Sequence, residues 1–529
     1  MAATSPPRRG EAPHVDSVTL RARLGAGSSA PNHRDKALEA QCARHARRHA
    51  SDPENHDVLY AWGLTLQERA ECAEETAAAA PQQQQQQQQQ QRGGTDAAGH
   101  ARHHGSRATR DAYLRAACDA YAKAISLHPR FPAALYNHGI ALGDLARAAQ
   151  GADAEAATSL WKSACAQYAR AVVAAESACE ERHHGHRGSG DDARSIVPKA
   201  SASASARGDA PRVVRVASPT DTVRALNNWG LAEQRLAGLA SSAPGRLARL
   251  TRAASRFREA LRRDPGFHRA AYNLGTVMYA LAELAARRAR KLEAARGSPE
   301  EVETLEALAR GLSDQGFIAG ATAPAAAAEC RAAAAAHICL AAAGADDDAS
   351  RDAYRASLAL VRRALPSARD SRSDPADVTP ETPRRFFVFR GSLRRERERG
   401  ALGGWRAAMS FAADHAFFFE LPSGGAEGHT HETDKTDTRM CVRLADITRV
   451  AAAARDASFP TPGFRGNDVS AASAKAPFGF FTHERDGTAR WFVAPDEPSR
   501  DLWVDALSLA SDIARRGKSG ALERELLGV

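Results

Sequence analysis

The chain has 529 residues, a formal net charge of +9 at pH 7, and hydrophobic residues at 43% of its positions. This length allows several domains, and the positive charge suits an acidic partner, although much of the excess is arginine spread over long polar inserts. The sequence has no run of 18 apolar residues, which argues against a membrane-spanning helix, and its eight cysteines form no C-x-x-C pair, which favours a reducing compartment over a disulfide framework or a zinc module.

Residues 1–34 are rich in serine, proline and arginine. This composition is partly typical of an organelle transit peptide, but Glu11 and Asp16 interrupt it and no amphipathic helix follows. We therefore expect a disordered N-terminus on a cytoplasmic protein.

A spacing of one proline followed ten residues later by one glycine recurs along the next 330 or so residues. The pairs are Pro53 with Gly63, Pro129 with Gly139, and Pro265 with Gly275. Small and aromatic residues recur at helical spacing before or between these pairs: Ala117, Tyr121 and Ala124; Ala164, Tyr168 and Ala171; Ala253, Phe257 and Ala260. The pattern predicts antiparallel helix pairs that stack, because small residues let helices approach and one aromatic per pair fills the space to the neighbour.

In chain order the pattern first predicts a helix over 35–50 and a helix that contains Tyr60, Trp62, Gly63 and Leu66. Further helices are predicted over 107–128, 132–149, 156–178 and 222–239, followed by one that ends at Pro265 and one that begins at His268. The last predicted helices of the array are 287–296, 300–311, 325–343 and 350–365. Two polar inserts, 77–106 and 180–218, interrupt this array of residues 35–365 and are expected to be disordered. The first insert holds ten consecutive glutamines, residues 82–91. Both inserts carry histidines, but a polar insert without fixed geometry does not predict a metal site.

After a linker at residues 366–383, the period of the sequence changes. Aromatic and β-branched residues cluster in short runs bounded by Gly, Pro and Asp, which predict strands. The runs are FFVFRGSL (386–393), WRAAMSF (405–411), HAFFFEL (415–421), MCVRLADITRV (440–450), FGFFTHE (478–484) and ARWFVA (489–494). A single amphipathic helix is predicted next, with Pro498, Leu502, Trp503, Ala506, Leu507, Ala510 and Ile513 on one face. Residues 384–517 thus form a second domain, and residues 518–529 a tail.

The helical array resembles the tetratricopeptide repeat, whose unit is a pair of antiparallel helices. The C-terminal domain resembles the pleckstrin homology domain, with residues 391–395 as its first strand, 405–419 as its second and third, and Trp503 in the place of the family's tryptophan. The fold class that these resemblances imply is α + β multidomain, with an α-helical repeat solenoid followed by a small β-barrel and a C-terminal capping helix.

Three asparagines stand two residues before the central glycine of a predicted first helix: Asn137, Asn228 and Asn273. An amide offers both a donor and an acceptor, so a row of them suits the backbone of an extended peptide. The row is similar to the asparagine ladder of the O-linked N-acetylglucosamine transferase. The alternative is that these amides bond within the scaffold.

The resemblance to phosphoinositide-binding pleckstrin homology domains implies a weak headgroup site at Arg394, Arg395 and Arg406. Several converging cations are needed to hold phosphate oxygens, and Ala408 stands where the family has a further arginine. The alternative is that these arginines belong to solvated loops.

The sequence contains no phosphate loop, no G-x-S-x-G elbow and no H-E-x-x-H motif. We therefore expect a non-enzyme without catalytic residues, cofactor or metal. The hypothesis is an adaptor that holds a protein segment in the repeat groove, while the C-terminal domain contacts anionic phospholipid or a second protein.

The domain order also resembles plant and algal proteins of the trans-Golgi network, early endosome and actin. This resemblance implies peripheral membrane association. Two alternatives stay open: a co-chaperone for acidic chaperone tails, whose clamp is incomplete because Leu64 follows Gly63, and an RNA-associated scaffold that uses the basic inserts. Nucleic acid is the less favoured partner, and the sequence leaves the oligomeric state open.

Overall fold

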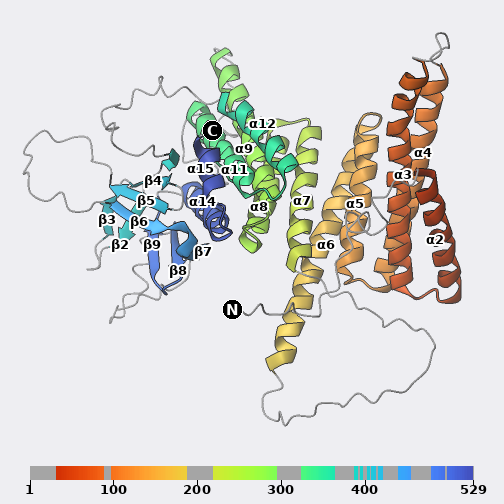
Figure 1. The fold of residues 1–529 in the computed structure, drawn as a ribbon, viewed down its shortest axis with the longest axis horizontal. Coiled ribbons are helices and arrows are strands. Elements are labelled where there is room, and N and C mark those ends of the chain that lie inside the picture. The colour runs from red at the N-terminus through yellow and green to blue at the C-terminus, as the bar shows by residue number, and fades with distance from the viewer. Residues whose placement is uncertain are drawn as a thin grey trace, which may run out of the picture. The chain divides into compact units, whose positions relative to one another are not determined.

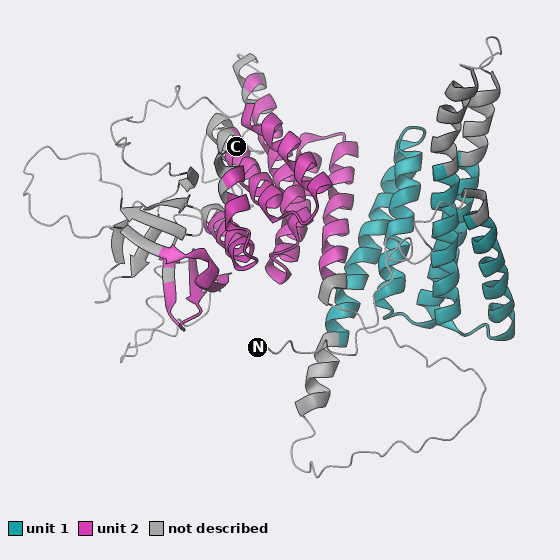
Figure 2. Ribbon diagram, viewed as in Figure 1, with its two compact units in different colours: residues 1–201 teal, residues 202–529 magenta. Residues whose placement is uncertain are grey.

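The computed structural model describes residues 31–88, 97–187, 219–294, 323–363, 386–390, 393–396, 402–405, 407–412, 415–420, 439–453, 478–494 and 497–527. It divides the chain into two compact units, residues 1–201 and 202–529, called unit 1 and unit 2 (Figure 2). Most of the predicted N-terminal segment, the linker at 366–383, the core of the insert at 180–218 and the helix predicted at 300–311 lie outside the described residues.

Unit 1 is built of helices that each pack against the next one along the chain (Figure 1). They are α2 (Pro31–Ser51), α3 (His56–Gln88), α4 (Ala97–Leu127), α5 (Pro132–Ala149) and α6 (Ala154–Arg187). The predicted helices of this region are confirmed. Helices α3 and α4 also extend into the insert at 77–106, which was expected to be disordered, because alanine and glutamine are good helix formers that continue an established helix readily.

Unit 2 begins with more helices of the same kind and ends with strands and two further helices. The first helices are α7 (Pro219–Leu239), α8 (Ala243–Arg263), α9 (His268–Ala294), α11 (Ala323–Gly344) and α12 (Asp348–Arg363). Contacts join α7 with α8, α8 with α9, α9 with α11, and α11 with α12.

Prolines end the helices as the sequence predicts. Helix α8 stops at Arg263, and Asp264 leaves the helical conformation directly before Pro265, because the residue before a proline is driven from the α region. The same helix begins after Ser242, whose hydroxyl accepts a hydrogen bond from the backbone N–H of Gly245. These local signals set the two ends of α8.

Glycine packing closes the helix pairs, and it recurs in four of the pairs that the structure describes. A Cβ placed on the glycine would lie 2.5 to 2.6 Å from an atom of the facing side chain. The facing pairs are Gly63 with Tyr121, Gly139 with Tyr168, Gly230 with Phe257, and Gly275 with Ile338. The predicted aromatic therefore lies against the glycine of its own pair instead of serving only the neighbouring pair, because the absence of a Cβ leaves room for the ring.

Two antiparallel sheets follow in unit 2. Their strands are β1 (Phe386–Arg390), β2 (Leu393–Glu396), β3 (Leu402–Trp405), β4 (Ala407–Ala412), β5 (His415–Glu420), β6 (Arg439–Arg443), β7 (Ile447–Ala452), β8 (Gly479–Glu484) and β9 (Ala489–Val493), with a short 3-10 helix η2 (Leu444–Asp446) between β6 and β7. The orders are β1-β4-β5-β6 and β3-β2-β9-β8-β7.

The expectation of a closed barrel is wrong for the strands that the structure describes. The predicted first strand, residues 391–395, is preceded by β1, which pairs with β4, while β2 pairs with β3 and β9. Strands β1 and β2 belong to different sheets. One sheet ends at β1 and β6 and the other at β3 and β7, so both sheets are open. The strand character predicted from the aromatic runs is confirmed.

The chain ends in two helices, α14 (Glu497–Arg515) and α15 (Ser519–Leu527). Trp503 is buried, as predicted, together with Ala506, Leu507, Ala510 and Ile513. A second set on α14 is also buried, including Val504, Asp505, Leu509 and Ser511, because this helix contacts β7 and β8 and also α8 and α11. The predicted tail is helical, and its Leu522 is fully buried.

Candidate functional site

The two predicted asparagines of unit 2 are connected through a third amide. Asn273 of α9 donates from Nδ2 to Oδ1 of Asn227 of α7 at 2.9 Å, and Asn227 donates from Nδ2 to Oδ1 of Asn228 at 3.3 Å. One turn further along α9, Oγ1 of Thr276 accepts a hydrogen bond from Nε2 of Gln234 on α7, at 3.2 Å. The first helices of consecutive pairs therefore share a polar face of amides and hydroxyls.

Asn137 occupies the equivalent position in unit 1. Its Nδ2 donates to the hydroxyl of Tyr60 on α3, at 3.1 Å, and to the backbone oxygen of Ala133, at 3.0 Å. Tyr60 and Asn227 each stand three residues before the central glycine of their helix, so both asparagine amides reach back to the same place on the preceding first helix. Bonding within the scaffold is thus part of what Asn137 and Asn273 do.

A hollow of about 490 Å³ adjoins the polar face of unit 2, and we call it the α9–α12 hollow. It is lined by Thr276 and Tyr279 of α9, Ile338 of α11, and Ser357, Leu360, Val361 and Arg363 of α12. Helices α9 and α12, which both contribute to this lining, are joined by the ring of Tyr272 on α9, which stacks on Tyr354 of α12 with ring centroids 4.3 Å apart. Leu360 keeps 64% of its surface exposed, although it lines a mainly apolar space.

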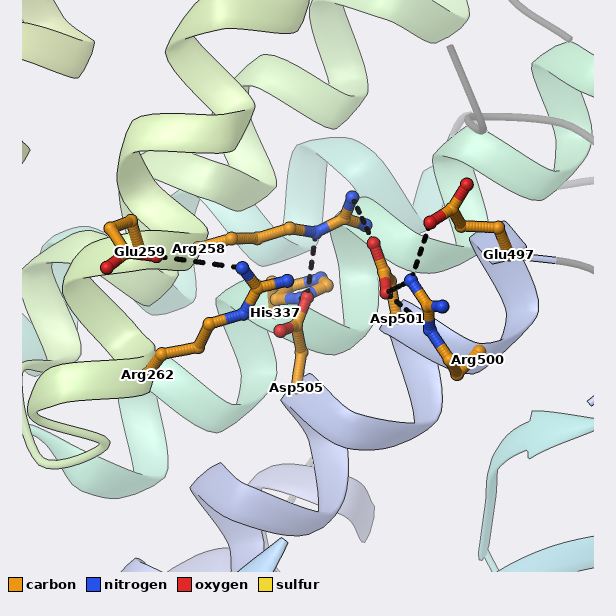
Figure 3. Close-up of polar contacts among 8 residues, drawn as sticks. All are labelled: Arg258, Glu259, Arg262, His337, Glu497, Arg500, Asp501 and Asp505. Atoms are coloured by element: carbon orange, nitrogen blue, oxygen red, sulfur yellow. Dashed lines mark hydrogen bonds and ion pairs between the residues drawn. The ribbon is translucent and has the colours of Figure 1, made fainter. Parts of the chain in front are cut away.

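A buried ionic cluster joins the helical repeats of unit 2 to the C-terminal helices (Figure 3). Arg258 of α8 donates from Nε to Oδ2 of Asp505 on α14 at 3.0 Å, and its Nη1 lies 3.5 Å from Oδ2 of Asp501. His337 of α11 is fully buried between two acceptors: its Nδ1 lies 2.8 Å from the backbone oxygen of Ala333, and its Nε2 lies 3.5 Å from Oδ2 of Asp505.

Charge compensation sets the pKa of Asp505. Burial by itself would raise the pKa of this carboxyl, but the guanidinium of Arg258 and the imidazole of His337 hold it below its ordinary value. At the rim of the cluster, Arg500 donates to Asp501 at 2.7 Å and to Glu497 at 2.8 Å (Figure 3). Shifting α14 along α8 and α11 would separate Asp505 from Arg258 and His337 and leave buried charge without a partner. The cluster therefore favours a single register of α14 on these two helices.

Further contacts fasten the end of the chain to α11 and α12. The ammonium of Lys518, after the left-handed turn at Gly517, donates to the backbone oxygens of Gly344 and Ala345 at the end of α11, each at 3.2 Å. A cation suits this position because the carbonyl end of a helix carries partial negative charge. On α15, Glu525 accepts from Arg355 of α12 at 2.6 Å.

The arginines predicted to hold a lipid headgroup are only partly described. Arg394 and Arg395 lie in β2, where Arg395 pairs in register with Gly403 of β3 and Arg394 pairs with Gly404. Arg406 lies outside the described residues, between β3 and β4. The structure therefore places two of the three on one strand, next to the hairpin that leads toward the third.

Within the described ranges, no group of three or more His, Cys, Asp or Glu side chains could hold a metal ion. The described cysteines, such as the buried Cys339, form no disulfide with one another. Among the helices that the structure describes, none combines the length and apolar character that crossing a bilayer requires.

Sequence reasoning missed the ionic cluster and the hollow. A signal for the cluster was present, since His337 interrupts the apolar run AAAAAHICLAAA and Asp505 interrupts the apolar face of WVDAL. An ionisable residue in such a position is buried only when it is paired. The hollow had no such signal, because its lining comes from three helices.

These features define an α + β protein that is mostly helical, with antiparallel sheets toward the C-terminal end. No known family model matches the chain, and no curated protein matches it at a significant level.

Proposed function

We propose that this protein is a non-enzymatic adaptor whose helix pairs are tetratricopeptide-like repeats and hold a segment of another protein. The observation that carries the proposal is the repeated geometry of the pairs. A glycine in the first helix lies against a large side chain of the second helix in four pairs, with tyrosine, phenylalanine or isoleucine as the facing residue, and Asn137 and Asn273 bond back to equivalent positions on the preceding first helix. Repetition of this kind makes a stacked scaffold whose function is its surface.

The polar face of unit 2 and the adjoining hollow support protein binding. Amide and hydroxyl side chains on α7 and α9 can exchange hydrogen bonds with an extended backbone, and the hollow offers apolar area beside them.

A photo-crosslinker tests the groove. Benzoylphenylalanine is placed at Thr276, on the polar face, or at Arg252 on α8, whose side chain is 46% exposed. Exposure of each full-length protein to cell extract is expected to give defined protein adducts at position 276 only. Equal adducts at the two positions, or none at position 276, would remove the groove from the proposal.

The C-terminal sheets with α14 are proposed to be a pleckstrin homology-like module that places the complex on an anionic membrane or a second protein, at the trans-Golgi network or early endosome. Liposome flotation with phosphoinositides, comparing the unmodified chain with an Arg394→Ala, Arg395→Ala and Arg406→Ala variant, tests the lipid part. The full chain is required, because α14 also contacts α8 and α11 and an excised module would lose its buried ion pairs. Flotation that is absent, or unchanged by the substitutions, rejects it.

A further inference from the structure

The α9–α12 hollow combines an apolar floor with a hydroxyl-bearing rim. Ile338 forms part of the floor, and Thr276 and Ser357 bring hydroxyls to the lining. The hydroxyl of Ser357 is 3.0 Å from that of Tyr272, which fixes its orientation. A space of this size and composition fits one or two side chains of a partner, with the hydroxyls beside the partner's backbone.

Leu360 is the exposed large apolar side chain of the lining. It keeps 64% of its surface in water, although other large apolar side chains on the same helix, Leu358 and Val361, are 3% and 4% exposed. Covering Leu360 would remove apolar surface from water, which favours association. The exposed leucine therefore marks the side from which a partner would close over the hollow.

One end of the hollow is positively charged. Arg363 lines it and forms no ion pair with any described side chain, whereas its neighbour Arg362 donates to the backbone oxygen of Glu525. On α9, Arg287 and Arg290 follow Tyr279 at helical spacing and are exposed. The one carboxylate on this stretch of α9, Glu283, is paired with Arg331 at 3.2 Å. An acidic ligand in the hollow thus meets the guanidinium of Arg363 next to the apolar space.

We propose that the α9–α12 hollow docks an acidic segment of a partner protein, with one leucine, isoleucine or phenylalanine side chain in the hollow and carboxylates beside it toward Arg363. This inference rests on the proposed groove function and names the chemistry of its ligand. Apolar burial supplies affinity, and the charge of Arg363 selects acidic over neutral or basic neighbours. Because Arg363 is exposed, binding weakens as salt concentration rises.

Fluorescence anisotropy of the full-length protein tests the proposal. The probe is a fluorescein-labelled synthetic peptide with one leucine inside a run of aspartates and glutamates. In two matched peptides, the acidic residues become asparagine and glutamine, or the leucine becomes serine. Each change is expected to weaken binding about tenfold, the effect of losing one charge-assisted or one well-buried apolar contact.

Variants assign the binding to the hollow. Leu360→Asp and Arg363→Glu are each expected to weaken binding of the acidic leucine peptide about tenfold. Ala359→Asp is the matched control, because this exposed position adds the same charge to α12 but does not line the hollow, and it is expected to leave the affinity within about twofold. Far-ultraviolet circular dichroism checks that each variant keeps its helix content.

The proposal is overturned by no binding of any of the peptides, by equal binding of the acidic and neutral peptides, or by unchanged affinity in both hollow variants. Self-association of the protein that Leu360→Asp abolishes would also overturn it, by making a second copy the occupant. The photo-crosslink at position 276 separates the outcomes. Adducts there without acidic-peptide binding leave the groove function in place and reject only this ligand, whereas loss of both rejects the groove itself.

Discussion

Units 1 and 2 use the same packing to close their helix pairs but differ at the next residue along the chain. In unit 1 the residues after the packing aromatics are Ala122, which is exposed, and Ala169, which is half-buried. In unit 2 the equivalent residue after Phe257 is Arg258, which is 8% exposed and bonded to Asp505 of α14. In both units a large side chain against a glycine closes the pair, and in the α7–α8 pair the residue after that side chain, Arg258, binds another part of the chain.

The units also differ in how they hold a buried carboxylate. In unit 1, burial raises the pKa of Glu68 to about 7, a nearby Glu71 adds to the rise, Arg34 opposes it, and Oε2 of Glu68 has no hydrogen-bond partner. In unit 2, Asp505 is equally buried, yet Arg258 and His337 hold its pKa below the ordinary value. Similar burial therefore gives opposite pH dependences, and the difference comes from the partner that each carboxylate meets.

The largest effect is expected from Arg258→Met, which leaves Asp505 buried without its guanidinium. Loss of one partner of a buried ion pair costs about 3–5 kcal/mol. Urea unfolding measures the loss, and hydrogen exchange of peptides from α14 and from α3 locates it, with faster exchange expected in α14 alone.

The control for this substitution is the double variant Arg258→Met/Asp505→Leu, which removes both charges and is expected to recover most of the stability. Equal loss of protection in both units would show that the ionic cluster is not what separates them.

Glycine substitutions test what the units share. Gly230→Ala and Gly139→Ala each push a Cβ to 2.6 Å from a buried ring, and such overpacking costs about 1–3 kcal/mol. Thermal unfolding of each full-length variant measures the effect. Gly238→Ala, on the same helix as Gly230 but with nothing within 4 Å of the added Cβ, is expected to stabilise by about 0.5–1 kcal/mol. A harmless Gly139→Ala would mean that unit 1 is not closed in the same way.

The pH dependence of unit 1 follows from Glu68. Its folded pKa is raised, so the folded unit binds the proton more tightly than the unfolded chain, and stability falls as pH rises from about 4.5 toward 7. Glu68→Gln is expected to be nearly neutral at pH 5 and to stabilise by about 1–2 kcal/mol at pH 8, less than the whole shift because solvent screens part of the charge. Hydrogen exchange of α3 at the two pH values measures it.

Unit 2 is expected to respond in the opposite direction. The pKa of Asp505 is lowered, so its contribution is present above the unfolded value near 4 and is lost as pH falls through the folded value. The Arg258→Met/Asp505→Leu variant should lack this loss when α14 exchange is compared between pH 5 and pH 3. If the variant and the unmodified protein lose protection in parallel, other acids dominate the acid response.

The smallest effect is expected from Lys518→Met. It removes a cation from the carbonyl end of α11 and from Asp346, whose pKa Lys518 lowers by hydrogen bonding. Because the group is partly exposed, the cost is about 0.5–1 kcal/mol. Faster exchange at the last turn of α11, with α9 unchanged, is the expected result, and Lys518→Arg should restore protection. Unchanged exchange at that turn would show that the ion pairs of α14 hold the end of α11 in place without Lys518.

Much of the fold was predictable because its signals are local. Proline positions gave the ends of α4 and α8, and small and aromatic residues at helical spacing gave the faces on which helices pair. The strands were predicted from short aromatic runs, but their division between two sheets was not, because nothing within β1 or β2 says which distant strand each will join.

The candidate site was predictable only in part. The asparagines were found from their repeated place before the glycines, but their partners Tyr60 and Asn227 were not, because hydrogen bonds between neighbouring helices depend on how the helices are rotated. An asparagine amide can bond to a peptide ligand or to a neighbouring helix, so the sequence pattern alone did not distinguish ligand binding from bonding within the scaffold.

By itself the sequence determined where helices and strands form and which small residues let helices approach, since backbone propensity and side-chain spacing act over a few residues. Only the tertiary structure decided which buried charges are compensated and where a hollow remains. Arg258 and Asp505 are 247 positions apart, and their attraction exists only after α14 has packed on α8. A contact made across such a separation depends on how distant elements pack and leaves no periodic pattern in the sequence.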